Sequence, residues 1–281
     1  MRLVAVRVVT DSTADLPLEL AQRWGIVVVP LNLHFGQQVY RDGVDLSADA
    51  FYQKLVASPS LPTTSQPSIG AFLETYHLLV EQGDQVVSVH ISSKLSGTYN
   101  SALRARQELP ASAQLETVDS QQGSMGLGLI VLQAARAAAQ GGSLEQVVRV
   151  AKEAIGRVHF FGLVDTLEYL QKGGRIGKAQ AFLGALLRVK PLITCREGEV
   201  HPLERAHSRA RGVQRLEELV RELAPVQDLG VIHSTTPDEA HALAGRLRSL
   251  TAGDVVVSQV GPVVGTYLGP GVLGVAVCRA R

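Results

Sequence analysis

Apolar, β-branched runs alternate along the first half of the chain with segments in which apolar side chains recur at helical spacing. The runs predict buried strands over residues 4–9, 26–31, 86–91 and 115–118. Helical spacing predicts helices that end near Trp24, cover 69–80 and begin at Thr98. A further, almost uncharged helix is predicted over 124–140, which is too short to span a bilayer. This alternation favours an α/β domain with a mainly parallel sheet.

The pattern changes near residue 158, where a hairpin signal joins the helices. Apolar runs at 191–195 and 200–206 flank a polar turn at 196–199, which is typical of a β-hairpin. The other elements predicted here are strands over 158–164, 229–233, 255–260 and 272–278, helices over 167–172, 182–187 and 209–223, and a glycine-rich loop over 261–271. We therefore predict a mainly parallel α/β domain over residues 1–157 and a smaller α/β domain with a mixed sheet over 158–281.

Two capping-box patterns mark expected helix starts. Ser143 is followed three residues later by Gln146, and Thr236 by Glu239. In such a box the hydroxyl accepts a hydrogen bond from the first helical turn, and the longer side chain accepts one from the cap backbone. Pro237 also suits the first helical position.

Composition narrows the class of protein. The chain has 281 residues, of which 46% are hydrophobic and 19% charged, so it is expected to fold around a core. The net charge is +1 and no long basic run occurs, which argues against nucleic acid as a partner. No segment approaches the roughly 20 apolar residues of a membrane span, so we expect no stable membrane insertion. Cys195 and Cys278 lie far apart and outside any C-x-x-C pattern, which argues against metal binding and disulfides and favours a reducing, cytoplasmic location.

A hydroxyl-rich loop at residues 92–97 (SSKLSG) links the strand over 86–91 to the helix that begins at Thr98. Backbone N–H groups at a helix N-terminus have no partner within the helix, and the helix dipole favours an anion there. The loop matches neither G-x-G-x-x-G nor G-x-x-x-x-G-K-[ST]. An anion site is one interpretation, and an equally good one is that Ser96 caps the helix while the other serines face water.

Other polar loops also have two interpretations, ligand binding and capping. Residues 61–67 (LPTTSQP) precede the helix over 69–80, and they could bind an anion or serve as a cap and turn. The polar residues at 11–13 and 119–120 follow strands, at the end where α/β proteins bind ligands, and capping explains them equally well. The histidines are scattered without ligand spacing, and no Ser–His–Asp ordering is apparent, so structural roles are expected for them.

Taken together, the motifs resemble those of the DegV family over nearly the whole chain. The matching segments are VTDSTADLP at 9–17, VPLNL at 29–33, TSQP at 64–67, SSKLSGTYNS at 92–101, VDS at 118–120, KGGRI at 172–176, KP at 190–191 and GPG at 269–271.

The resemblance implies a parallel α/β domain followed by a smaller mixed-sheet domain. It also implies binding of a long-chain fatty acid, whose carboxylate would be held by Thr64 and Ser96 with Ser65 and Gly97 close by, while the tail enters an apolar tunnel. Family members commonly carry His where this chain has Tyr267. Tyrosine can still donate a hydrogen bond, but it does not titrate near neutral pH.

Several members of the family present the lipid to the catalytic subunit of a bacterial fatty acid kinase. By this resemblance we expect that the chain is not itself an enzyme and needs no cofactor or metal, because the kinase would supply ATP, metal and phosphoryl transfer. Arg175 follows two glycines and is expected to project outward, either as a partner or phosphate contact or as a helix C-cap charge. Two alternatives remain: an enzyme acting on a small carboxylate or phosphate, and a regulatory module that binds another small acid.

Overall fold

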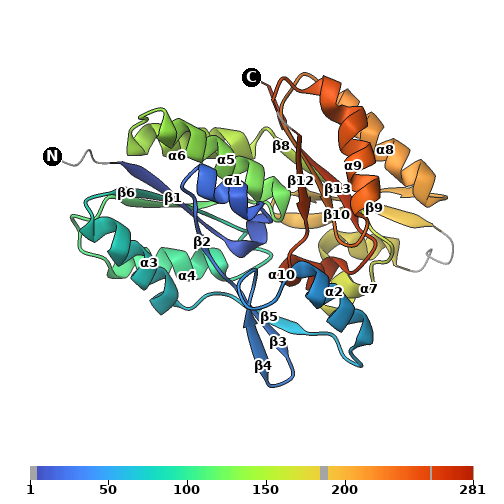
Figure 1. Cartoon of the computed structure of the whole chain (residues 1–281), viewed down its shortest axis with the longest axis horizontal. Helices are drawn as coiled ribbons and strands as arrows, with labels where there is room; N and C mark the ends of the chain where they lie inside the picture. Colours follow the sequence, from blue (N-terminus) through green and yellow to red (C-terminus); the bar gives the residue numbers. More distant parts are fainter. Residues whose placement is uncertain (1–4, 184–188, 254, 281) are drawn as a thin grey trace.

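The structure is a computed structural model that describes residues 5–183, 189–253 and 255–280. A parallel sheet with strand order β2-β1-β6-β7 forms the first half (Figure 1). Its strands are β1 (Val6–Asp11), β2 (Val27–Val29), β6 (Gln85–His90) and β7 (Leu115–Asp119). Alternate side chains face opposite sides of this sheet, because Val9 and Val86 pack in one apolar cluster and Val8 and Val87 in another.

Helices cover both faces of the parallel sheet. They are α1 (Leu18–Arg23), α3 (Ile69–Glu81), α4 (Thr98–Glu108), α5 (Met125–Ala139) and α6 (Leu144–Ile155). Figure 1 shows α3 and α4 on one side of the sheet and α5 and α6 on the other. The arrangement confirms the predicted α/β class and the parallel sheet.

A larger mixed sheet with strand order β10-β9-β8-β13-β11-β12 follows. Its strands are β8 (Val158–Leu163), β9 (Lys190–Arg196), β10 (Glu199–Ala206), β11 (Val226–His233), β12 (Val255–Gln259) and β13 (Leu273–Arg279). Neighbouring strands are antiparallel except β11 and β12, and the predicted hairpin is the β9–β10 pair. Helices α8 (Arg209–Glu222) and α9 (Pro237–Leu247) cover the outer face through a separate apolar cluster.

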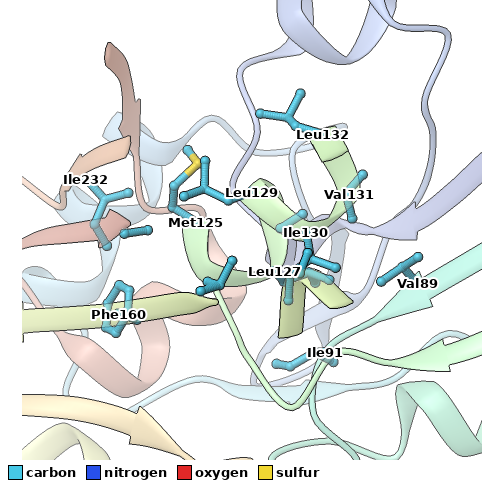
Figure 2. Close-up of a cluster of buried hydrophobic side chains, with 14 of the residues drawn as sticks. Val89, Ile91, Met125, Leu127, Leu129, Ile130, Val131, Leu132, Phe160 and Ile232 are labelled. Atoms are coloured by element: carbon cyan, nitrogen blue, oxygen red, sulfur yellow. The ribbon is translucent and has the colours of Figure 1, made fainter. Parts of the chain in front are cut away.

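Helix α5 lies between the two sheets, which explains why its sequence is almost uncharged. Its buried side chains meet Val89 and Ile91 from the parallel sheet, and Phe160 and Ile232 from the mixed sheet (Figure 2). One continuous apolar cluster therefore joins the two halves. The strands of the two sheets fall on either side of residue 157, and the division into domains at that point stays a prediction.

A small antiparallel sheet, with order β4-β3-β5, was not predicted from the sequence. It consists of β3 (Asn32–Phe35), β4 (Gln38–Arg41) and β5 (Thr63–Ser65), and it packs on α2 (Ala48–Ala57) around Leu33, Phe51 and Leu55. Helix α10 (Pro262–Leu268) packs against α2, β3, β5 and α7 (Glu168–Lys172). This helix corrects the predicted glycine-rich loop over 261–271, where its packing outweighs the local turn signals.

The capping predictions had different outcomes. Ser143 and Gln146 form both hydrogen bonds of a capping box at α6. Thr236 makes no such bond, because its hydroxyl points to the Val272 carbonyl oxygen at 3.4 Å, although Pro237 does open α9. The helix predicted over 182–187 falls largely on 184–188, outside the described residues. In the described part of the chain, no helix is long and apolar enough to cross a membrane.

Candidate ligand-binding site

An apolar cavity lies among the two main sheets, the loops at the ends of the parallel strands, and α10. Most of its wall is hydrocarbon, contributed by Leu31, Ile91, Leu95, Phe160, Leu170, Ile193, Val200, Val263, Val264 and Leu268. Its polar lining comes from Thr13, Thr64, Ser96, Ser124, Arg175, Thr194 and Tyr267, and the Cys195 thiol also lies in the wall. A mostly apolar cavity with a few polar side chains suits a ligand that is largely hydrocarbon and carries a polar group.

The hydroxyl groups of Thr64 and Tyr267 meet at one part of this wall, with Thr64 Oγ1 2.6 Å from Tyr267 Oη. The Arg175 guanidinium lies over the Tyr267 ring, with Cζ 4.8 Å from the ring centroid. All three residues also line a more polar pocket outside the cavity. They therefore form a wall between the apolar cavity and the surface, where a ligand's head group would be closest to solvent.

Arg175 does not project freely outward as its glycine-rich segment suggested. Its Nε donates to the Leu95 carbonyl oxygen at 3.2 Å and its Nη1 to that of Gly173 at 2.8 Å. Gly173 is needed here because a Cβ at this position would lie 2.4 Å from the Tyr267 ring. The arginine is thus half-buried and fixed against the cavity wall.

The two hydroxyl-rich loops, which the family resemblance assigned to one carboxylate, each contribute one residue to the cavity lining, Thr64 and Ser96, but their other members differ in position. Ser96 lines the cavity, and its Oγ lies 2.8 Å from Thr98 Oγ1 at the start of α4. Ser65 does not line the cavity, because its Oγ is turned to His34 Nε2 at 2.9 Å. Gly97 also lies outside the lining and lets the Gln66 side chain pack against it, since a Cβ there would be 2.6 Å from Gln66 Nε2.

Residues that follow the strands mainly organise these loops. The Asp11 carboxylate accepts hydrogen bonds from the backbone N–H groups of Thr13 and Ile91, each at 3.1 Å. The Asp119 carboxylate accepts from the Ser93 backbone N–H at 3.3 Å and from that of Gln121 at 3.0 Å. Both carboxylates therefore hold loop backbone, as the capping interpretation expected.

A buried Ser–His–Asp relay was missed by the sequence analysis. Ser88 Oγ lies 2.7 Å from His90 Nε2, and His90 Nδ1 lies 2.9 Å from Asp11 Oδ2. The Tyr76 hydroxyl donates to Ser88 Oγ at 2.8 Å, which extends the relay to a fourth side chain. All four side chains are essentially inaccessible to solvent. The relay is a structural network, because a substrate could not reach the serine.

The carboxylates of Asp15 and Asp42 are buried near Gly261, at the start of α10. Asp15 accepts hydrogen bonds from the Ser124 hydroxyl at 2.6 Å and the Gly261 backbone N–H at 2.9 Å, yet burial raises its pKa well above the usual range. Burial raises the pKa of Asp42 to about 6, opposed only in part by Ser12 and the Val263 N–H. Asp15 thereby joins the start of α10 to the residue that precedes α5.

The described residues contain no group of three or more His, Cys, Asp or Glu side chains that could hold a metal ion. The apolar part of the site could not be identified from the sequence, because Ile91 or Ile193 looks like any core residue of a strand. The hydroxyl loops were detectable because their composition is unusual before a helix start.

Comparisons with known proteins agree over nearly the full length. A family model described as "Uncharacterised protein, DegV family" matches residues 5–280. A DegV domain-containing protein of Streptomyces coelicolor is 41% identical over 278 residues, covering 97% of this chain and 98% of the relative. Protein DegV of Bacillus subtilis is 34% identical and covers 97% of this chain and 99% of its own.

Solved structures give the same picture. A DegV family protein from Thermus thermophilus, described by its fatty acid binding, superposes with a TM-score of 0.92 at 35% identity, covering 99% of this chain and 100% of the other. DegV from Bacillus subtilis, described as a fatty acid binding protein, gives a TM-score of 0.88 at 33% identity with the same coverage. A stearic acid-binding protein from Eubacterium ventriosum gives 0.88 at 28% identity and covers 98% of each chain. Sequence and fold together show that this chain belongs to the DegV family.

Proposed function

We propose that the protein binds one long-chain fatty acid, with the tail in the apolar cavity and the carboxylate beside Thr64, Ser96 and Tyr267. The observation that carries the proposal is a cavity lined mainly by hydrocarbon in which two hydroxyl groups, those of Thr64 and Tyr267, meet next to an outer pocket. Relatives with the same fold are described as fatty acid binding proteins, which supports the same ligand class here.

The energetics favour a long tail. Each methylene moved from water into an apolar cavity gains about 0.8 kcal/mol, so a dozen outweigh the contribution of the head group before ordering costs. Hydroxyl donors stabilise a carboxylate without forming a tight ion pair, while the half-buried Arg175 adds a positive charge at the Tyr267 ring. The site can therefore hold the anion and still release it.

We further propose that the protein presents this carboxylate to the catalytic subunit of a fatty acid kinase, and is not an enzyme by itself. Thr64, Arg175 and Tyr267 line both the cavity and the outer pocket, so a carboxylate beside them would lie close to an approaching partner. In such a complex the partner supplies nucleotide, metal and phosphoryl transfer, and this chain supplies an oriented acyl group.

An enzyme acting on a small carboxylate or phosphate is the weaker alternative. The Ser88–His90–Asp11 relay has the residue types of a hydrolase triad, but its side chains are sealed in the core. It meets the cavity lining through Asp11, which accepts hydrogen bonds from the backbone N–H groups of Thr13 and Ile91. A small polar substrate would also leave most of the hydrocarbon wall without contacts. A regulatory module that binds another small acid is disfavoured for the same reason, because that acid would also leave most of the hydrocarbon wall without contacts.

The test is organic extraction of freshly purified protein followed by mass spectrometry, with quantification against the protein. We expect close to one equivalent of long-chain fatty acid per chain. The same extraction from an unrelated protein of similar size, purified identically, corrects for lipid carried over from the host. Protein that contains no fatty acid, and that binds none after addition of a C16 acid, would refute the proposal.

A further inference from the structure

The apolar cavity approaches the surface at a second place, away from the Thr64–Tyr267 wall. A separate surface pocket is formed partly by Gln121, His159, Phe161 and Arg196, and it shares the lining residues Thr194 and Cys195 with the cavity. This pocket has no lining residue in common with the outer pocket beside Tyr267. At two different places, therefore, the wall between the cavity and a surface pocket is thin, because the same residues line both.

The second thin part of the wall is closed by two neighbouring side chains of β9. Thr194 is fully engaged, because its hydroxyl donates to the Phe160 carbonyl oxygen at 2.7 Å and fixes it to β8. Cys195 makes only a weak contact, from Sγ to the Gln121 carbonyl oxygen at 3.4 Å, across to the loop that follows β7. The thiol also packs against the apolar cluster that joins the two main sheets, so packing rather than strong hydrogen bonding positions it.

The chemistry of the thiol suits contact with a hydrocarbon chain. Burial raises the pKa of Cys195 to about 12, so the group is a neutral thiol at physiological pH. A neutral thiol behaves as a small apolar side chain. Cys195 therefore continues the apolar lining formed by Ile193 and Phe160 up to the surface pocket.

We propose that Cys195 is the stop for the end of the acyl tail, and so sets the longest chain that the cavity accepts. With the carboxylate at Thr64 and Tyr267, the tail fills the cavity toward the second thin wall, and a longer chain would have to displace the thiol to enter the pocket beyond. This inference rests on the proposed function and extends it to a residue that determines chain-length specificity.

The experiment changes the size of this stop in both directions. The parent, Cys195→Ala and Cys195→Met are stripped of lipid and offered an equimolar mixture of saturated C14 to C22 acids, and the bound acids are quantified by mass spectrometry. Cys195→Ala should shift binding toward longer acids, by about fourfold for each additional methylene buried. Cys195→Met should shift it toward shorter acids.

Cys278→Ala is the matched control, because this second cysteine is buried in β13 within the same apolar cluster and does not line the cavity. It should keep the parent's chain-length profile. Thermal unfolding of each variant checks the fold, and Cys195→Val offers a smaller enlargement of the stop if Cys195→Met fails to fold.

The outcomes separate the two proposals. A parent that binds no acid of any length refutes the proposed function itself. A parent that binds acids, with profiles unchanged in the folded Cys195 variants, refutes only the assignment of Cys195 as the stop.

Discussion

Tyr267 Oη lies 2.6 Å from Thr64 Oγ1, although the two residues are 203 positions apart in the chain. Tyr267 comes from α10, next to the last strands of the mixed sheet, and Thr64 from β5 of the small sheet. Since each hydroxyl has a single proton, one of the pair can donate to the other while the second donates to a carboxylate. The two groups are therefore expected to act as a unit in binding.

Replacing Tyr267 tests this unit. Tyr267→Phe should weaken binding of a C16 acid by about 0.5–1.5 kcal/mol, because the ring still packs but one donor is lost. In a double-mutant cycle with Thr64→Ala, the combined loss should be smaller than the sum of the two single losses. Fluorescence displacement titrations measure the affinities. Strict additivity would show that the hydroxyls act independently.

Tyr267→His gives the binding site a titratable group. A protonated imidazole beside the carboxylate should strengthen binding below its pKa of about 6.5, and the gain should disappear as pH rises above 7. The parent should show no such step between pH 6 and 8, and titrations at several pH values compare the two proteins. A flat profile for the histidine variant would place its side chain away from the carboxylate.

Ser96 tests the other hydroxyl loop. Ser96→Ala should weaken fatty acid binding by about 1–3 kcal/mol, because a buried carboxylate oxygen loses a donor. Ser65→Ala is a suitable comparison, since Ser65 faces His34 rather than the cavity and should leave the affinity close to that of the parent. If Ser65→Ala were the more damaging change, the head group would lie on the opposite side of β5.

The buried relay offers a test against the enzyme alternative. Ser88→Ala leaves the Tyr76 hydroxyl and His90 Nε2 without their partner in the core, and should lower the free energy of unfolding by about 1–3 kcal/mol. Fatty acid affinity should not change, because Ser88 does not line the cavity. Chemical denaturation and lipid titration measure the two effects. Hydrolysis of an ester substrate that disappears with Ser88→Ala would instead support catalysis.

The sequence was sufficient to predict most of the longer helices and strands. In segments such as α5 and β6, the pattern of apolar and polar residues is enough to predict the element. It was insufficient for β3, β4 and β5, whose three or four residues each are too few for a periodic pattern. Helix α10 was hidden by Gly261, Gly265 and Gly269, which are typical of turns, whereas its contacts with α2 and the small sheet stabilise it.

Some residues of the candidate site could likewise be predicted from the sequence, and others could not. Thr64 and Ser96 could be selected because hydroxyl groups before helix starts are chemically distinctive, and both line the cavity. The relation of Arg175 to Tyr267 could not be inferred, because it depends on the close approach of α7 and α10 at Gly173. Thr13 and Ser124 line the cavity as parts of loops held by Asp11 and Asp15.

Asp42 should make stability depend on pH. Its folded-state pKa of about 6 lies above the ordinary value of 3.8, so the folded protein binds the proton more tightly. Its contribution is therefore most favourable below pH 4 and is lost as pH rises from about 4 to 6, by up to about 3 kcal/mol. Asp42→Asn removes this loss.

The variant Asp42→Asn should be more stable than the parent above pH 6 and nearly equal to it at pH 4. Denaturation midpoints of both proteins across pH 4–8 give the difference, which cancels the effects of other titrating groups. Asp45→Asn is the control, because Asp45 is exposed and paired with Arg41. A difference between Asp42→Asn and the parent that does not vary with pH would contradict the assignment.

Variants at Arg175 and Lys172 distinguish an effect on lipid binding from an effect on partner recognition. Both line the outer pocket, but only Arg175 also lines the apolar cavity, where it lies over Tyr267. Arg175→Ala should lower fatty acid affinity modestly, since it removes a positive charge near the carboxylate, and should strongly reduce acyl phosphate formation with a fatty acid kinase catalytic subunit. Lys172→Ala should leave affinity unchanged, because Lys172 is exposed and paired with Glu168. Titration and a phosphorylation assay on fully loaded protein distinguish the two effects. If loaded Arg175→Ala were phosphorylated as fast as the parent, the arginine would serve only the lipid site.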